Sequence, residues 1–295
     1  MPTISFAGAH TALVTPFRDG VIDEVALTSL IEFQIQAGIS DIIPVGTTGE
    51  SPTLSHEEHR RVIEVAIAAA NKRILVIAGT GSNATSEAVQ LTIEAEKLGA
   101  DAALLVAPYY NKPSAEGLYR HFKSVADAVS IPIVLYSIPG RCGIEIPVSV
   151  VARLAADCPN IVAIKEAGGS VERVNQLRAA LPTSFEILSG DDSLTLPFMA
   201  AGAVGVISVA SNIIPSDVQN LVQSFLGGDT AKSQAIQQRY YPLFRDLFLE
   251  PNPVPIKTAL AQKGFCAEDV RLPLCEMSPS NRDTLIKTLQ SAGIL

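Results

Sequence analysis

Ile161-Val-Ala-Ile-Lys165-Glu-Ala167 is a short apolar run that ends in a lysine, and two glycines follow it directly. Its length and nearly continuous hydrophobicity are typical of a strand that is buried on both faces of a parallel sheet. The chain contains further runs of strand length with the same apolar character. They occupy residues 12–17, 41–45, 74–78, 103–107, 133–137, 186–189 and 205–209.

Amphipathic helices are predicted between these strands, because apolar residues repeat with the helical period in segments such as 62–70 and 84–98. Ser55-x-x-Glu58 and Ser216-x-x-Gln219 have the pattern of capping boxes that begin two of the helices. Strand-and-helix units that repeat at roughly thirty-residue spacing predict an α/β fold, a closed (β/α)8 or TIM barrel. An open, doubly wound sheet is the alternative, but no G-x-G-x-x-G follows the first strand.

The end of the chain departs from this alternation. Residues 231–249 predict a helix, the proline-rich residues 250–255 predict a rigid break, and two further helices are expected after it. We therefore expect a catalytic barrel over residues 1–228 and a C-terminal helical region, an appendage to the barrel, over residues 229–295.

Composition argues against several kinds of partner. The 295-residue chain carries a net charge of −8 and has no run of Lys or Arg, so neither nucleic acid nor an anionic membrane is expected to bind it. Residues 193–216 carry no charge and are long enough to cross a bilayer. Proline and glycine divide them, however, and predict a short helix, a turn and a buried strand.

The cysteines and the N-terminus bear on the compartment. Cys142, Cys158, Cys266 and Cys275 have neither C-x-x-C nor zinc-finger spacing, which is typical of free thiols in a reducing compartment. The first residues lack the basic and apolar regions of a signal peptide. We therefore expect a cytoplasmic protein.

Polar side chains follow several of the predicted strands, and in a (β/α)8 barrel such strand ends meet at one pocket. Burial would lower the pKa of Lys165, and only a neutral amine can attack a ketone to form an imine. The alternative is a lysine that reaches solvent from the strand end. Tyr136, one strand away, can exchange protons with the intermediates. Alone, it is equally typical of a tyrosine that packs at a barrel mouth.

Two loops predict anion-binding groups. Gly46-Thr47-Thr48-Gly49 offers backbone amides and hydroxyls to a small carboxylate, although such a turn also occurs as a purely structural element. Arg141 can bind a second carboxylate through two hydrogen bonds, or it is a solvated loop arginine. Asp191 and Asp192 would repel a phosphate near the last strands, where many barrels bind one, so we expect a substrate without phosphate.

His56 and His59 lie three residues apart, but the residues between them do not form H-E-x-x-H. We expect no metal site there. Solvated residues at a helix start are one interpretation, and a regulatory ligand is the other.

Taken together and in order, these strand-end motifs resemble those of the dihydrodipicolinate synthase family of pyruvate-dependent class I aldolases. The resemblance implies a lyase of lysine and diaminopimelate biosynthesis that condenses pyruvate with L-aspartate 4-semialdehyde through a lysine Schiff base, without another cofactor. The matching segments are Gly46-Thr-Thr-Gly-Glu-Ser51, Tyr109-Tyr-Asn-Lys-Pro113, Ile164-Lys-Glu-Ala167, Leu188-Ser-Gly-Asp-Asp192 and Glu250-Pro-Asn-Pro-Val-Pro255.

The resemblance also implies the roles of particular residues. Lys165 would form the imine, and Thr48, Tyr136 and Tyr110 would relay protons. The tyrosine that matches Tyr110 crosses from a neighbouring subunit in the family, so the active site would need at least a dimer. The homo-oligomer that we expect is a homotetramer, a dimer of dimers. The substrate-binding residues would be Thr47 and Thr48 for the pyruvate carboxylate, Gly190 and Ile207 for the lining of its pocket, and Arg141 for the carboxylate of the aldehyde.

Members of the family that are inhibited by L-lysine bind it at a subunit interface. Pro52 stands where such members usually have alanine, and Ser137 and Cys142 replace the usual asparagine and threonine near the second-substrate pocket. The positions that match the lysine site are Ser51, His56, His59, Asn83, Glu87 and Tyr109.

Two other functions remain as alternatives. Another pyruvate-dependent aldolase or dehydratase would act on N-acetylneuraminate or a 2-keto-3-deoxy sugar acid. A non-catalytic sensor of small molecules would keep the barrel and perform no covalent chemistry. The paired threonines and paired tyrosines favour the condensation of pyruvate with the semialdehyde, because the proton relay of the family uses both.

Overall fold

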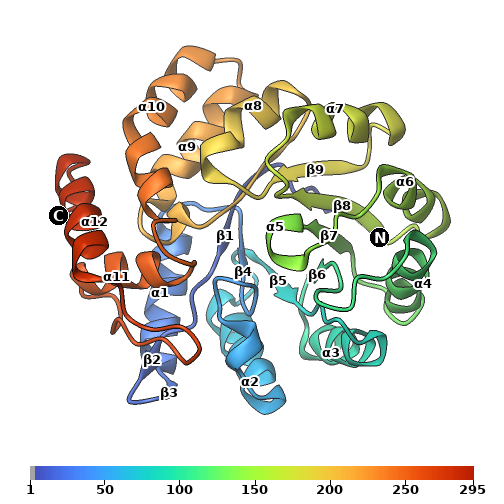
Figure 1. Ribbon diagram of the computed structural model, residues 1–295, viewed down its shortest axis with the longest axis horizontal. Helices are drawn as coiled ribbons and strands as arrows, with labels where there is room; N and C mark the ends of the chain where they lie inside the picture. The colour runs from blue at the N-terminus through green and yellow to red at the C-terminus, as the bar shows by residue number, and fades with distance from the viewer. Residues whose placement is uncertain (1–3) are drawn as a thin grey trace.

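The computed structural model describes residues 4–295, and parallel strands form a closed barrel at its centre (Figure 1). Each strand pairs with the next along the chain, and β1 closes the barrel by pairing with the last strand, β10. This confirms the predicted (β/α)8 barrel. The barrel strands are β1 (Gly8–Ala12), β4 (Asp41–Ile43), β5 (Leu75–Gly79), β6 (Ala102–Val106), β7 (Ile133–Ser137), β8 (Ile161–Glu166), β9 (Glu186–Ser189) and β10 (Gly205–Ser208).

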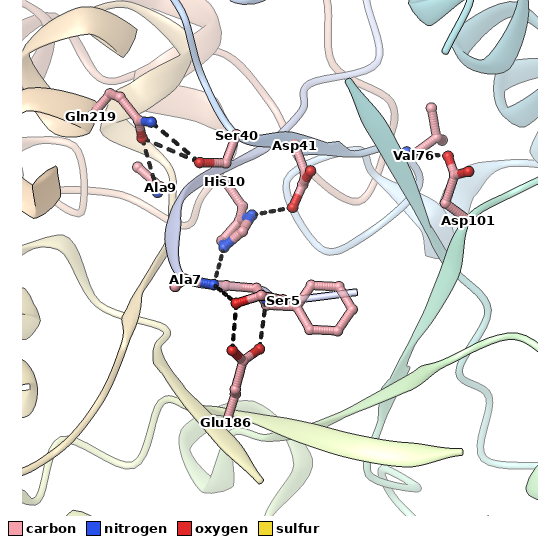
Figure 2. A network of polar contacts seen from close by, with 11 residues as sticks. Ser5, Ala7, Ala9, His10, Ser40, Asp41, Val76, Asp101, Glu186 and Gln219 are labelled. Atoms are coloured by element: carbon pink, nitrogen blue, oxygen red, sulfur yellow. Dashed lines mark hydrogen bonds and ion pairs between the residues drawn. The ribbon is translucent and has the colours of Figure 1, made fainter. Parts of the chain in front are cut away.

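The first strand lies earlier in the chain than predicted, so the prediction of residues 12–17 is wrong. β1 contains His10 and Thr11, so its sequence lacks the apolar pattern of a buried strand, yet both side chains are fully buried. Figure 2 shows His10 beside Asp41, and its Nδ1 lies 2.7 Å from the Asp41 carboxylate. The other ring nitrogen, Nε2, lies 2.7 Å from the Phe6 carbonyl. Polar residues in a strand are tolerated in the interior when they find partners of this kind.

Helices cover the outside of the barrel (Figure 1). The hairpin of β2 (Phe17–Arg18) and β3 (Val21–Ile22) precedes the first of them, and α5 (Pro139–Cys142) is a single turn after β7. The others are α1 (Glu24–Gln36), α2 (His56–Ala70), α3 (Thr85–Leu98), α4 (Ala115–Ala126), α6 (Val148–Asp157), α7 (Val171–Ala180), α8 (Thr195–Ala200) and α9 (Pro215–Leu226).

Of the two predicted capping boxes, one is confirmed and one is wrong. Ser55 and Glu58 exchange both hydrogen bonds at the start of α2. In α9, Pro215 occupies the first turn and Ser216 lies inside the helix, where its hydroxyl donates to the Ala37 carbonyl. Gln219 is used for tertiary packing, because its side-chain oxygen accepts a hydrogen bond from the Ala9 amide of β1.

The C-terminal helices are α10 (Thr230–Asp246), α11 (Val254–Gln262) and α12 (Pro279–Ser291). The predicted break at residues 250–255 is present, although α11 already begins inside it. In α10, Ser233 is fully buried and its hydroxyl donates to the Leu221 carbonyl of α9. The division of the chain at residue 228 stays a prediction.

Apolar side chains fill two layers. One cluster, which includes Ile43, Leu104, Tyr136 and Ile207, occupies the inside of the barrel, and a larger one lies between the strands and the surrounding helices. The four cysteines are unpaired, as predicted. Among residues 4–295, no helix has the length and hydropathy of a membrane-spanning segment.

Candidate active site

Lys165 lies near the C-terminal end of β8 with its side chain 6 % exposed. Its amine is 4.2 Å from the centroid of the Tyr136 ring. Burial lowers the pKa of this amine to about 7; the Arg141 charge acts in the same direction, while the Asp192 charge opposes it. A large fraction of the amine is therefore neutral near neutral pH, which is the form that attacks a carbonyl.

Tyr136 lies directly beside Lys165, because β7 and β8 pair these two residues in register. Its side chain is 5 % exposed, and burial raises the pKa of the phenol to about 12, against smaller opposing effects of Arg141 and Thr47. The phenol thus keeps its proton near neutral pH. It can donate this proton to the oxygen of an adduct that a carbonyl compound forms with the Lys165 amine.

The two threonines stand on a tight loop after β4. Gly49 is required there, since a Cβ atom at this position would lie 2.9 Å from the Val45 backbone nitrogen. Thr48 is 2 % exposed, and its Oγ1 accepts a hydrogen bond of 2.9 Å from Asn252 Nδ2. Because Asn252 supplies the donor, the Thr48 hydroxyl keeps its own hydrogen for another acceptor.

Gly190 makes room for the lysine side chain. A Cβ atom at this position would lie 3.0 Å from Lys165 Cε and 2.6 Å from Ala167 Cβ. The Gly190 amide donates to the Glu166 carbonyl at 2.8 Å, which fixes the turn after β9 against β8. A side chain here would therefore push the amine out of its position.

Arg141 lies on α5 at the exposed mouth of the pocket, and its Nη2 donates to the Asn252 carbonyl at 3.2 Å. Asn252 therefore contacts both Thr48 and Arg141. The sequence offered one signal for it, an asparagine between two prolines in residues 250–255, but no role was predicted.

One pocket brings most of the predicted substrate residues together. Ile207 does not line it: this residue is 1 % exposed in the cluster inside the barrel, whereas Val209 of the same segment does line the pocket. The lining residues are Ala12, Ile43, Gly46, Thr47, Thr48, Leu104, Tyr136, Ile138, Arg141, Lys165, Gly190, Val209, Phe248 and Asn252.

Tyr110 stays outside this pocket. Its side chain is 90 % exposed, and its backbone has a φ of 71°, in the left-handed region that residues with a side chain rarely adopt. The loop after β6 thus presents the phenol to the surroundings of the chain. Within one chain, the predicted proton relay is incomplete without it.

The positions that match a lysine site lie together near the starts of α2 and α3. His56 Nε2 is 2.7 Å from Glu87 Oε1, and Asn83 Nδ2 donates to the Tyr109 carbonyl at 3.2 Å. His59 is nearly buried and bonded to the Gly79 carbonyl, and burial lowers its pKa. A second pocket, next to the first, is lined by Ser51, Pro52, Tyr109 and Cys142 among others.

The family model described as "Dihydrodipicolinate synthetase family" matches residues 5–292 of this barrel. The chain belongs to that family. It is 52 % identical to the 4-hydroxy-tetrahydrodipicolinate synthase of Aquifex aeolicus, over 98 % of each chain.

Solved structures agree with this membership. The 4-hydroxy-tetrahydrodipicolinate synthase of Methylacidiphilum fumariolicum SolV is 54 % identical, with a TM-score of 0.97 over 98 % of this chain and 96 % of that one. The dihydrodipicolinate synthase of Cyanidioschyzon merolae, solved with lysine bound, is 41 % identical with a TM-score of 0.96 over 98 % and 99 % of the two chains.

In this member of the dihydrodipicolinate synthetase family, Asp192 is a second residue whose place near the amine was not predicted. It is 3 % exposed, and its Oδ2 accepts hydrogen bonds of 3.0 Å from the amides of Val209 and Ala210. The sequence places Asp192 at a strand end that faces the pocket and within a segment that matches the family, but the role predicted for it is repulsion of a phosphate. Among the described residues, no group of three or more His, Cys, Asp or Glu side chains is placed to hold a metal ion.

Proposed function

We propose that this chain condenses pyruvate with L-aspartate 4-semialdehyde to 4-hydroxy-tetrahydrodipicolinate, as a lyase of lysine and diaminopimelate biosynthesis. The observation that carries this proposal is the buried Lys165 amine, whose pKa lies at about 7 beside the Tyr136 phenol. Two further findings support it: the chain belongs to the family, and relatives that are about 50 % identical to it are named for this activity.

The first half of the reaction forms a covalent bond between the protein and pyruvate. The neutral Lys165 amine attacks the ketone carbon, and the resulting carbinolamine loses its hydroxyl as water after that oxygen is protonated. In this proposal the phenol of Tyr136 gives this proton, and the resulting phenolate takes one from the methyl group as the enamine forms. Thr47 and Thr48 bind the pyruvate carboxylate, with Gly190 leaving space for the lysine chain.

The second half joins the two substrates. The enamine carbon attacks the aldehyde carbon, forming a carbon–carbon bond and an alkoxide that takes up a proton. The amino group of the second substrate then attacks the imine carbon, closes the ring and displaces Lys165 by transimination. Arg141, at the mouth of the pocket, binds the carboxylate of this second substrate.

The working form that we propose is a cytoplasmic homotetramer, a dimer of dimers. Tyr110, which is exposed in one chain, would reach the pocket of its neighbour and complete the proton relay there. The cluster of His56, Glu87 and Tyr109 would bind L-lysine as an inhibitor at the same interface. A lysine-bound structure of a 41 % identical relative supports this regulatory site.

Trapping of the imine tests the chemistry directly. Borohydride added to the protein with pyruvate should leave one reduced adduct per chain, which peptide mass spectrometry places on Lys165. Lys165→Ala should give no adduct, while Lys72→Ala, which removes a surface lysine paired with Asp101, should behave as wild type. Trapping without turnover of L-aspartate 4-semialdehyde, combined with turnover of a sugar acid, would instead identify another pyruvate aldolase. Absence of any adduct would refute the proposal.

A further inference from the structure

The loop that carries Thr47 and Thr48 is held between two strained residues. Val45 precedes it with a φ of 53°, and Glu50 ends it with the same value, both in the left-handed region. A β-branched valine adopts this conformation rarely, and such strain persists only where surrounding contacts hold the backbone in place. The contacts made by Glu50 therefore bear on the position of Thr48, two residues before it.

Those contacts come from the C-terminal end of the chain. The side chains of Glu50 and Lys257 are both fully buried, and Lys257 Nζ of α11 donates to Glu50 Oε1. The other carboxylate oxygen, Oε2, accepts a hydrogen bond of 3.0 Å from the Arg271 amide. Both oxygens of Glu50 are thus held by residues more than 200 positions away.

Lys257 makes further contacts besides its ion pair with Glu50. Its ammonium also donates to the Asp269 carbonyl at 2.8 Å and lies 4.1 Å from the centroid of the Phe17 ring. Burial of a charge is unfavourable, and a buried ion pair often adds little to stability compared with apolar residues of the same volume. The pair joins α11 to the loop of residues 46–50, called the threonine loop below. This points to a role in fixing the position of that loop.

We propose that Lys257 is a positioning residue for the active site. Through Glu50 it holds the loop of residues 46–50 in its strained conformation, so that the Thr48 hydroxyl stays at the pocket beside Lys165. Asn252, just before α11, contacts Thr48 directly, so the same C-terminal segment reaches this threonine by two routes. For turnover, this inference rests on the function proposed above.

Three variants test it: Glu50→Gln and Lys257→Met, which each leave one buried charge without its counter-charge, and the double variant, which removes both charges. Thr288→Val is the matched control, since it removes a hydroxyl of α12 that donates to buried Asp246 in the same C-terminal region, away from the loop. Hydrogen exchange of the amides of residues 46–51 is measured in each protein, together with kcat and KM for pyruvate.

We expect faster exchange in residues 46–51 for all three test variants and wild-type exchange there for Thr288→Val. Because a displacement of about 1 Å can lower a rate by about 100-fold, kcat should fall by about 10- to 100-fold in each test variant. Thr288→Val should keep the wild-type kcat. The double variant should lose no more than the worse single variant, because both side chains act through one contact.

The results that would contradict the role of Lys257 differ from those that would contradict the proposed function. If the loop exchanges as in wild type in the test variants, or if the two single losses simply multiply in the double variant, the inference is wrong. Should a single variant fail to fold, the double variant carries the same comparison, since it buries no unpaired charge. Wild-type protein without turnover would refute the proposed function, whereas the exchange measurement would still decide the role of Lys257.

Discussion

The chemistry of single residues is governed here by burial. Lys165 and Tyr136 are neighbours on adjacent strands, and burial moves their pKa values in opposite directions, to about 7 and about 12. At neutral pH this combination supplies a neutral amine beside a protonated phenol. A nucleophile and a proton donor are thus available together, which an exposed pair with ordinary pKa values would not provide.

The pKa of Lys165 predicts how imine formation depends on pH. Below its pKa of about 7 the amine is protonated, so the rate of trapping at low pyruvate should fall with decreasing pH and level off above that value. Asp192→Asn removes a negative charge that raises this pKa, and the inflection should move to lower pH. Arg141→Gln removes a positive charge that lowers it, and the inflection should move to higher pH.

The measurement is the rate of adduct formation from about pH 5 to 9, with borohydride in excess. Each variant is normalised to its own plateau, so that changes in pyruvate affinity do not enter the comparison. Thr288→Val, which is remote from the pocket, should reproduce the wild-type profile. Shifts of the same sign in Asp192→Asn and Arg141→Gln would contradict the electrostatic account.

The site residues that can be predicted from the sequence lie at strand ends, whereas the residues that cannot be predicted contact the site from a distant part of the chain. Lys165 and Tyr136 stand at the ends of apolar runs, so a strand pattern alone places them at one pocket. Asn252 and Lys257 contact the threonine loop from 204 and 207 residues away. A contact over such a separation leaves no periodic or local pattern, and only the folded chain reveals it.

Among the elements, the strands that are apolar throughout were predicted at nearly their observed positions. β1 was misplaced because its burial depends on partners in other segments: Thr11 donates to Gln34, and His10 lies against Asp41. The cap predicted at Ser216 failed for a similar reason, since Gln219 bonds to β1 instead of its own helix start. Tertiary contacts overrode a local pattern in both cases.

The starts of α2 and α3 form the proposed lysine site, and Glu87 is its decisive charge. Hydrogen bonds from Ser82 and His56 help to lower the pKa of this carboxyl, so it remains ionised at neutral pH and can pair with an ammonium group. We predict that L-lysine inhibits wild-type turnover. Glu87→Gln should raise the concentration needed for half inhibition by about tenfold or more, since hydrogen bonds to charged groups contribute about 1.5–3 kcal/mol.

Glu57→Gln provides a matched control for this prediction, because it removes the same kind of charge from an exposed position on α2. It should leave both turnover and inhibition as in wild type. Glu87→Gln should keep turnover without lysine close to the wild-type value, which separates regulation from catalysis. Wild-type activity that stays constant across a millimolar lysine titration would refute the regulatory site, and Pro52 would be the first residue to examine.

At the scale of the whole molecule, one chain presents a nearly complete pocket and an exposed tyrosine that lies outside it. Tyr110 is 90 % exposed, whereas the other predicted members of the relay, Thr48 and Tyr136, are buried. A second copy related by a two-fold axis would place the same loop of each chain at the pocket of the other. Catalysis would then depend on assembly, even though all the other pocket residues belong to one chain.

Mixing two inactive variants tests this dependence. Lys165→Ala lacks the nucleophile and Tyr110→Phe lacks the phenol, so each alone should have little activity. In a mixed dimer, one site combines the lysine of one chain with the tyrosine of the other. Random mixing of two-fold dimers in equal amounts should therefore restore about a quarter of the wild-type sites, and purification of the mixed dimers alone should raise this fraction to about half. Coexpression with two affinity tags and assay of the doubly purified protein measures the gain.

Tyr241→Phe is the control for this experiment, because it alters a second exposed tyrosine, on α10, away from the pocket. It should be fully active alone, so any loss in Tyr110→Phe reflects the position and not the general removal of a phenol. If Tyr110 acted within its own chain, every subunit of the mixture would lack one essential group, and mixing would restore nothing. A restored fraction thus requires that the site be shared between two chains.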